Sequence, residues 1–190
     1  MRHYTPLSVR TLEEHTPRLG ARVLIDPTAV VIGDVTMGDD SSVFPHVVIR
    51  GDVHRVVIGS RTNVQDGAVL HVTHVGDPRD PAGHPLLIGD DVTIGHKAIL
   101  HGCTIGNRVL VGMGAVLMDG VVVEDDVMIA ANALIPPGKR LERGWLYKGT
   151  AQQARPLTEA ELGGLRYSAS LYIGIKDRHI AALEKMAAGD

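Results

Sequence analysis

Aliphatic residues recur at every sixth position over most of this chain, from Ile25 to Ile135, with three breaks in phase. A small or β-branched residue stands two positions before nearly every aliphatic one. A period of six fits neither the 3.6-residue repeat of an amphipathic helix nor the alternation of a flat strand. It is typical of short strands separated by turns, three of which close one triangular coil. The sequence therefore predicts an all-β solenoid, a left-handed parallel β-helix of hexapeptide repeats.

Proline- and glycine-containing stretches set the expected boundaries of the β-helix and of its inserted loop. We expect the β-helix to cover residues 21–137, because the repeat ends at Pro136-Pro137. The Pro/Gly/Asp-rich segment 72–85 interrupts the repeat and is predicted to be an inserted surface loop. Glycine directly follows several of the aliphatic residues, where we expect it to give the turns a freedom that a Cβ would deny. These positions are Gly38, Gly59, Gly89, Gly95, Gly106 and Gly112.

The two ends of the chain lie outside the repeat. Residues 1–20 are predicted to form an N-terminal cap segment, with one or two helical turns within 8–15. Residues 138–157 are expected to be a connection. Thr158 and Glu161 have the spacing of a capping box, and an apolar stripe follows them. We therefore predict a C-terminal α-helix over 158–187 that packs along the β-helix.

Composition narrows the possible functions. The formal net charge of -3 provides no basic stripe for nucleic acid. No apolar run is long enough to span a membrane, and the first 15 residues do not resemble a signal peptide. We therefore expect a cytoplasmic protein without nucleic-acid or membrane partners. The single cysteine, Cys103, occupies a small inward position of the repeat and is interpreted as core filling.

Counting hexads places three histidines on two columns. Residues three hexads apart share a face and stack at about the 4.8 Å strand spacing. Arg50, His71 and His101 follow equivalent aliphatic residues and should form one column. Asp66 and His96 should form a second column on another face. Every break in the repeat falls at the corner beside the first column, so the loop 72–85 should overhang it.

Three imidazoles with an open fourth position are a typical catalytic zinc site. His71 and His101 are expected to share the metal, whereas His96 lies on the wrong face to join them within one chain. Subunits packed side by side would bring the columns together, and a cyclic trimer is the simplest closed arrangement. A metal site shared between subunits is therefore the first functional hypothesis.

Polar neighbours of the histidines have candidate roles in the same site. Arg50 could pair with Asp52, Asp66 could orient His96 as a hydrogen-bond acceptor, and Gln65 could hold water or bicarbonate. The alternative for Arg50, Asp52 and Asp66 is a salt-bridge network that only holds subunits together. His74 and His84 in the loop are either proton carriers or solvated residues.

Three segments, VVIRGDVHRVVIGSRTNVQDGAVLHVTH, IGDDVTIGHKAILHGCTIGNRVLVGMGAVLMDG and LYKGTAQQARPLT, resemble the γ-class carbonic anhydrase-like family of left-handed β-helix proteins. The resemblance covers nearly the whole chain. It implies a homotrimer with zinc, or iron (Fe²⁺) or cobalt (Co²⁺), at each subunit interface. It also implies that His71 and His101 come from one subunit and His96 from the next. By the same resemblance Arg50, Asp52, Gln65, Asp66 and Tyr167 are interface and active-site residues.

The function implied by the resemblance is reversible hydration of carbon dioxide by metal-bound hydroxide. The chain departs from the archaeal members of the family, because Val53 stands where they have a glutamate and the loop 72–85 contains no glutamate. Such glutamates would carry protons away from the metal-bound water, and general acid–base assistance is worth about 10² to 10⁴ in rate. The sequence therefore agrees with a slow enzyme as well as with a fast one.

Three alternatives share parts of this pattern. A hexapeptide acyltransferase that uses coenzyme A has the same fold but does not need a metal-binding histidine trio. A metal-dependent thioester hydrolase would use the same site. A non-catalytic assembly or siderophore-binding protein would have the trimer without turnover.

Overall fold

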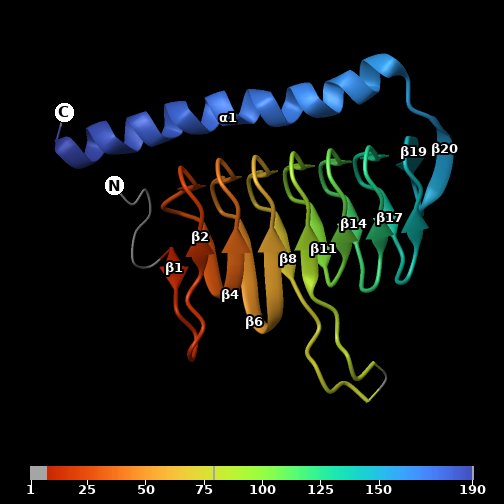
Figure 1. Ribbon diagram of the computed structural model, residues 1–190, viewed down its shortest axis with the longest axis horizontal. Coiled ribbons are helices and arrows are strands. Elements are labelled where there is room, and N and C mark those ends of the chain that lie inside the picture. The colour runs from red at the N-terminus through yellow and green to blue at the C-terminus, as the bar shows by residue number, and fades with distance from the viewer. Residues whose placement is uncertain (1–7, 79, 190) are drawn as a thin grey trace.

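The chain coils into a triangular prism of short parallel strands, with one long helix along its side (Figure 1). The computed structural model describes residues 8–78 and 80–189. The predicted parallel β-helix with a C-terminal helix is confirmed.

A 12-stranded sheet forms two faces of the prism. Two long strands run through both faces, and they are β4 (Val30–Met37) and β6 (Val48–Ile58). The first face continues with β8 (Val69–His71), β11 (Ile99–His101), β14 (Val116–Leu117) and β17 (Leu134–Ile135). The second continues with β9 (Leu86–Ile88), β12 (Thr104–Ile105), β15 (Val122–Val123) and β18 (Arg140–Leu141). The strands β1 (Val9–Arg10) and β2 (Arg18–Leu19) pair with β4 at the N-terminal end.

An eight-stranded sheet forms the third face. Its parallel strands are β3 (Leu24–Ile25), β5 (Ser42–Val43), β7 (Asn63–Val64), β10 (Thr93–Ile94), β13 (Leu110–Val111), β16 (Met128–Ile129) and β19 (Trp145–Lys148). The last strand, β20 (Gln152–Pro156), turns back antiparallel to β19. The segment 138–157, expected to be a plain connection, therefore contains β18, β19 and β20 and continues the β-helix.

The residues of the six-residue repeat form the core of the β-helix. All the repeated aliphatic residues from Ile25 to Ile135, and the small residues two positions before them, are buried. Cys103 is one of them, and burial raises the pKa of its thiol. The interpretation of Cys103 as core filling therefore agrees with its position.

The six glycines that directly follow aliphatic residues are needed for a different reason from the expected freedom of the turns. None of the six glycines has a positive φ. The left-handed conformation falls instead on residues such as Asp40, Arg61 and Asp91, with φ between 57° and 58°. A Cβ on Gly59 would collide with the Asp90 carboxylate and with the Gly89 backbone of the next coil. These positions need glycine because neighbouring coils approach too closely for a side chain.

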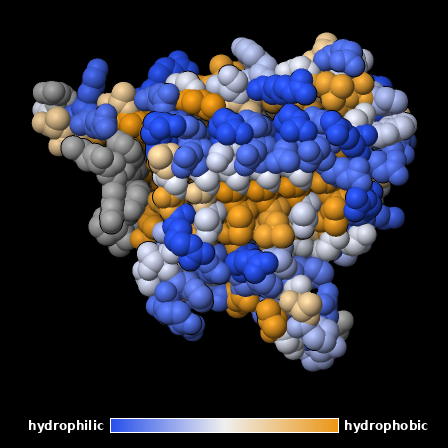
Figure 2. Space-filling model, in the orientation of Figure 1, coloured by the Kyte–Doolittle hydropathy of each residue, from blue (hydrophilic) through white to orange (hydrophobic). Residues whose placement is uncertain are grey.

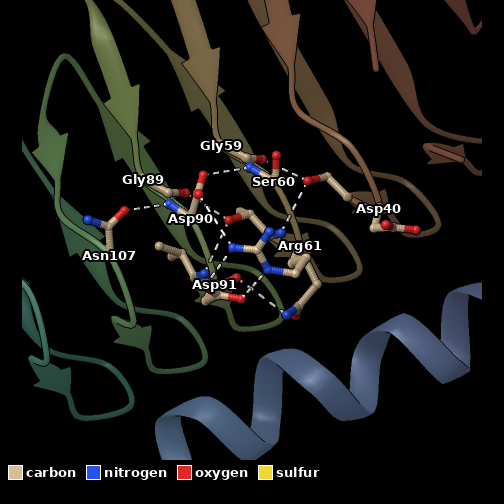
Figure 3. A network of polar contacts seen from close by, with 12 residues as sticks. Asp40, Gly59, Ser60, Arg61, Gly89, Asp90, Asp91 and Asn107 are labelled. Carbon is tan, nitrogen blue, oxygen red and sulfur yellow. Dashed lines mark hydrogen bonds and ion pairs between the residues drawn. The ribbon is translucent and has the colours of Figure 1, made fainter. Parts of the chain in front are cut away.

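The same corner carries a ladder of arginine–aspartate pairs, and Figure 3 shows one of them, Arg61 with Asp91. Arg61 Nε donates to Asp91 Oδ1 over 2.7 Å, and Arg61 Nη2 donates to Asp91 Oδ2 over 2.9 Å. Similar pairs join Arg22 to Asp40 and Arg108 to Asp126. Charged side chains at this turn therefore hydrogen-bond one coil to the next.

The helix α1 (Glu159–Ala188) begins at the capping box that the sequence predicted. Thr158 Oγ1 accepts from the Glu161 backbone N–H, and Glu161 accepts from the Thr158 backbone N–H. The helix contacts β3, β5 and β10 and so lies along the third face. Its fully buried Lys176 donates to Asp40 over 3.2 Å. In Figure 2 hydrophobic side chains gather on the coils below the helix.

The N-terminal cap differs from the expected helical turn. Residues 1–7 of the predicted cap lie outside the described residues. Within 8–15 the chain forms β1 and an antiparallel bridge between Leu12 and His15. Within the described residues, no helix is long and apolar enough to cross a membrane.

Candidate metal centre

His71 and His101 stack at the corner where the first face ends. They follow buried Leu70 and Leu100, and their Cα atoms are register partners in β8 and β11. His71 Nδ1 lies 3.0 Å from His101 Nε2. The predicted stacking of these two histidines is confirmed, and it brings one nitrogen of each ring to the same point.

Carboxylates hold the outer nitrogen of each ring. His71 Nε2 lies 3.0 Å from Asp52 Oδ1, and His101 Nδ1 lies 2.6 Å from Asp119 Oδ1. Arg50 pairs with Asp52 from the other side. Burial acts to raise the pKa of Asp52, but the hydrogen bonds from Arg50 and His71 outweigh it and hold that pKa below its usual value. Asp52 is therefore an ionised acceptor.

This arrangement fits a metal ion. A carboxylate only accepts, so Asp52 fixes the ring proton of His71 on Nε2 and Asp119 fixes that of His101 on Nδ1. In the neutral rings the facing nitrogens are then both lone pairs, which a cation between them would satisfy. Burial lowers the pKa of His71 and so favours its neutral, ligating form. Zinc–nitrogen bonds in a tetrahedral site place nitrogens about 3.3 Å apart, close to the separation observed.

His96 lies at a different corner, between the third face and the first. Its Nδ1 is 2.8 Å from Asp66 Oδ2, which confirms the predicted second column. Asp66 thereby leaves His96 Nε2 as the free nitrogen of the neutral ring. Within the described residues, one chain brings no three His, Cys, Asp or Glu side chains together to hold a metal.

Gln65 sits beside His96 rather than beside His71. Its side chain is buried, and its Nε2 donates to Asn63 Oδ1 over 3.1 Å. Gln65 and His96 line the same groove, of about 460 Å³, together with Ser168 and Tyr172 of α1. The second column therefore has an adjacent cavity of its own.

Tyr167 is not brought to either column within one chain. It is 67% exposed on α1 and does not line the groove. Tyr172 of α1 lines the groove instead. Burial and the nearby Asp66 raise the pKa of the Tyr172 hydroxyl. The assignment of Tyr167 to the active site stays a prediction.

The loop 72–85 walls the first column, as its position in the repeat predicted. It extends from the corner below β8 (Figure 1). A cavity of about 570 Å³ lies between loop and corner, lined by His71 and His101 together with His74, His84 and Val53. His84 Nε2 is 2.7 Å from Asp80 Oδ2 within the loop. Both loop histidines thus face the candidate metal position.

Two polar residues of the site were missed by the sequence analysis. Asp119 follows Leu117 by two positions and therefore falls outside the column that follows the aliphatic residues directly. Asn63 is buried and precedes Gln65 by two positions on the same side of the strand. The alternation of side chains along a strand would have placed Asn63 beside Gln65.

Comparisons with known proteins find the hexapeptide repeat and several similar proteins. A family model described as bacterial transferase hexapeptide (six repeats) matches residues 102–137. Protein YrdA of Escherichia coli is 58% identical over 173 residues, which cover 90% of this chain and 94% of the relative. The mitochondrial γ-carbonic anhydrase 1 of Arabidopsis thaliana is 41% identical over 95% of this chain and 64% of its own length.

The chain belongs to the γ-carbonic anhydrase-like family of hexapeptide-repeat proteins. A solved structure from Bacillus cereus, described as a putative acetyltransferase, superposes with a TM-score of 0.85 at 32% identity. That match covers 92% of this chain and 97% of the other. Proteins named for two different activities, carbonic anhydrase and acetyl transfer, are therefore similar to this γ-carbonic anhydrase-like chain over nearly its whole length.

Proposed function

We propose that this protein is a metal-dependent carbonic anhydrase-like enzyme that interconverts carbon dioxide and bicarbonate. Its metal, zinc or else Fe²⁺ or Co²⁺, would be held by His71 and His101 of one subunit and the partner subunit's His96. The observation that carries the proposal is the pair of facing imidazole nitrogens, each ring held from behind by a carboxylate. A cytoplasmic location, expected from the sequence, belongs to the same proposal.

The surface between the two columns supports a homotrimer. An outward row of apolar residues runs along the first face in register, comprising Val30, Val48, Val69, Ile99, Val116 and Leu134. Ile99 is 42% exposed and Leu134 is 40% exposed. A continuous apolar row of this kind marks an interaction surface. Since the histidine columns flank this face, packing it against a neighbour in a closed ring would bring His96 to the other column.

In the proposed site the histidines hold the metal and the aspartates orient the histidines. A divalent cation held by three imidazoles lowers the pKa of water, to about 7 in known carbonic anhydrases, and so supplies a nucleophile at neutral pH. Asp52, Asp66 and Asp119 orient the three imidazoles and fix which nitrogen is free. Arg50 holds Asp52 in place.

Gln65 would bind water or bicarbonate beside His96. Asn63 uses only one of the two N–H donors of the Gln65 amide, so the other donor and the carbonyl are available for a polar ligand. The loop histidines His74 and His84 are the candidates for carrying protons away from the cavity. Because Val53 lines that cavity where a carboxylate could have stood, we expect the proton step to limit the rate.

Metal content and mass of the purified protein test this proposal. We expect about one metal ion per chain in a trimer, and carbon dioxide hydration that is lost on chelation and restored by zinc or iron. His96→Ala should lose the metal while keeping the trimer mass, and His179→Ala, in α1 against Phe44, is the matched control. A wild-type trimer that cannot be loaded with any of these metals would refute the proposal.

Acyl transfer from a coenzyme A thioester is the second candidate. The Bacillus cereus structure described as a putative acetyltransferase favours it. The two functions separate on metal dependence, because the transferases of this fold need a single catalytic histidine. Turnover of acetyl-coenzyme A that survives chelation would favour transfer over hydration.

A further inference from the structure

Asp119 contacts both the candidate metal centre and the loop that covers it. We propose that Asp119 couples the docking of loop 72–85 to the orientation of His101, so that metal binding and loop docking strengthen each other. Asp119 is thus a positioning residue for the loop as well as for the imidazole. The inference rests on the metal site of the proposed function, but the anchoring of the loop can be tested without metal.

The two oxygens of Asp119 are divided between the two elements. Oδ1 accepts from His101 Nδ1 over 2.6 Å, and Oδ2 accepts from the Thr73 hydroxyl over 2.9 Å. Thr73 lies in the first turn of the loop, 46 residues from Asp119 in sequence. Hydrogen bonds to an ionised acceptor are among the stronger ones in proteins. With a donor on each oxygen, the carboxylate cannot rotate without breaking one of the two contacts.

Thr73 is also the anchor of the loop's own backbone. The Thr73 N–H donates to the His84 carbonyl over 3.0 Å, and the His84 N–H donates to the Thr73 carbonyl over 3.1 Å. This pair closes the base of the loop, so a shift of Thr73 would move both of its ends. The Asp119–Thr73 hydrogen bond therefore fixes the base of the loop against the coil that carries Asp119.

Close packing leaves the loop base little room to slide. A Cβ added to Gly102 would lie 2.6 Å from His84 Cβ and would collide with Asp119 Oδ1. His84 Cε1 lies near Gly120 on the following turn. The loop base, His101 and Asp119 thus pack as one unit around Gly102, directly beside the cavity that His71 and His101 line.

Thermodynamic linkage then couples metal binding to loop docking. If the position of Asp119 that orients His101 is also the one that accepts from Thr73, a metal bound to His101 stabilises the docked loop. By reciprocity, the docked loop then strengthens metal binding by the same factor. Outer hydrogen-bond partners of metal ligands are worth about 10- to 100-fold in metal affinity, and we expect the Thr73 contact to supply about fivefold of that.

The experiment uses four full-length proteins: wild type, Thr73→Val, Thr73→Ser and Asp119→Ala. Valine has the shape of threonine without the hydroxyl, and serine restores the hydroxyl. Zinc affinity is measured by competition with a chelator. Hydrogen exchange of the Thr73 and His84 amides is measured with and without zinc. The hydrogen-bonded Leu24 amide of β3, at the N-terminal end of the third face, serves as the internal reference.

The expected result is a graded one. Zinc should slow exchange of both loop amides in wild type and in Thr73→Ser, but not in Thr73→Val. Zinc affinity should fall about fivefold in Thr73→Val and about 10- to 100-fold in Asp119→Ala, and should stay near wild type in Thr73→Ser.

Two results would overturn the inference, and they differ from failure of the proposed function. Equal loop exchange in metal-free wild type and Thr73→Val would show that Asp119 does not anchor the loop. Zinc protection of the loop that persists in Thr73→Val would show that coupling does not pass through this contact. If wild type binds no metal, the proposed function fails, and with it the claim that metal binding strengthens loop docking. The exchange rates of the metal-free proteins then still test whether Asp119 anchors the loop.

Discussion

His71 Nδ1 and His101 Nε2 lie 3.0 Å apart, and on the far side of each ring a carboxylate holds the other nitrogen. Two neutral imidazoles held in this way place lone pairs opposite each other, which is unfavourable without a cation between them. The fold imposes the arrangement, because β8 and β11 are in register and the two carboxylates come from the same corner. This pair of facing nitrogens is thus the geometry on which the proposed metal site rests.

Removing the charge behind His71 should weaken metal binding without unfolding the protein. Asp52→Asn loses the ionic partner of Arg50 and the strong acceptor of the His71 ring proton. We expect metal affinity to fall about 10- to 100-fold, measured by chelator competition. The control is Asp34→Asn, whose carboxylate pairs with Arg18. Equal affinity in wild type and Asp52→Asn would contradict an orienting role for Asp52.

The hexad phase could predict the fold and both columns, because the period decides which residues point inward and which stack. Once Leu70 and Leu100 are placed in the core, His71 and His101 must be neighbours. The same reasoning paired Asp66 with His96. These contacts depend only on strand register, which the sequence pattern specifies strongly.

Contacts made at the corners could not be predicted in this way. The hexad of Leu100 is one residue short, and Gly102 takes a φ of 51° there, so the chain turns tightly and Asp119 reaches back to His101. Neither the turn nor the return of the loop onto Asp119 follows from periodicity. The β-helix beyond Ile135 is missed for another reason, because Pro136-Pro137 resembles the end of the repeat although Leu141 and Tyr147 keep the six-residue spacing and are buried.

A charge placed on the apolar row should separate the subunits. Ile99→Asp puts a carboxylate in the middle of the outward row on the first face, where an interface would bury it without a partner. We expect the solution mass to shift from trimer to monomer and the metal to be lost, since His96 can no longer reach the other column. Light scattering after size exclusion checks the mass. Leu171→Asp, an equally exposed position on α1 at 44%, should leave the trimer intact.

The arginine–aspartate ladder should make stability depend on acid pH. The hydrogen bond from Arg108 holds the pKa of Asp126 below its usual value, although burial opposes it. A carboxylate with a depressed folded pKa contributes its full stability above the unfolded value, near pH 4, and loses it as pH falls through the folded value. Asp126→Asn should therefore cost about 2 kcal/mol at pH 7, or about 4–8 °C in Tm.

The difference in Tm between Asp126→Asn and wild type should narrow as pH falls below 4, because acid neutralises the wild-type carboxylate as well. Thermal unfolding from pH 7 to pH 3 at one fixed protein concentration measures this gap. Glu14→Gln, an exposed carboxylate beside His15, should follow the wild-type curve throughout. A gap that stays constant down to pH 3 would exclude the ionised Asp126 as its cause.

A methyl group at Gly102 should disturb the metal centre through packing alone. Gly102 and Gly138 both have positive φ, 51° and 68°, so alanine at either position carries a backbone cost of about 1 kcal/mol. Only at Gly102 would the new Cβ also press on Asp119 and His84, whereas nothing lies within 4 Å of a Cβ at Gly138. We expect Gly102→Ala to be the less stable variant and to bind zinc about tenfold more weakly, with Gly138→Ala near wild type in affinity. Because neither substitution replaces a charged or ligating residue, a matched loss of affinity in both would mean that general destabilisation, and not the position of Asp119, controls metal binding.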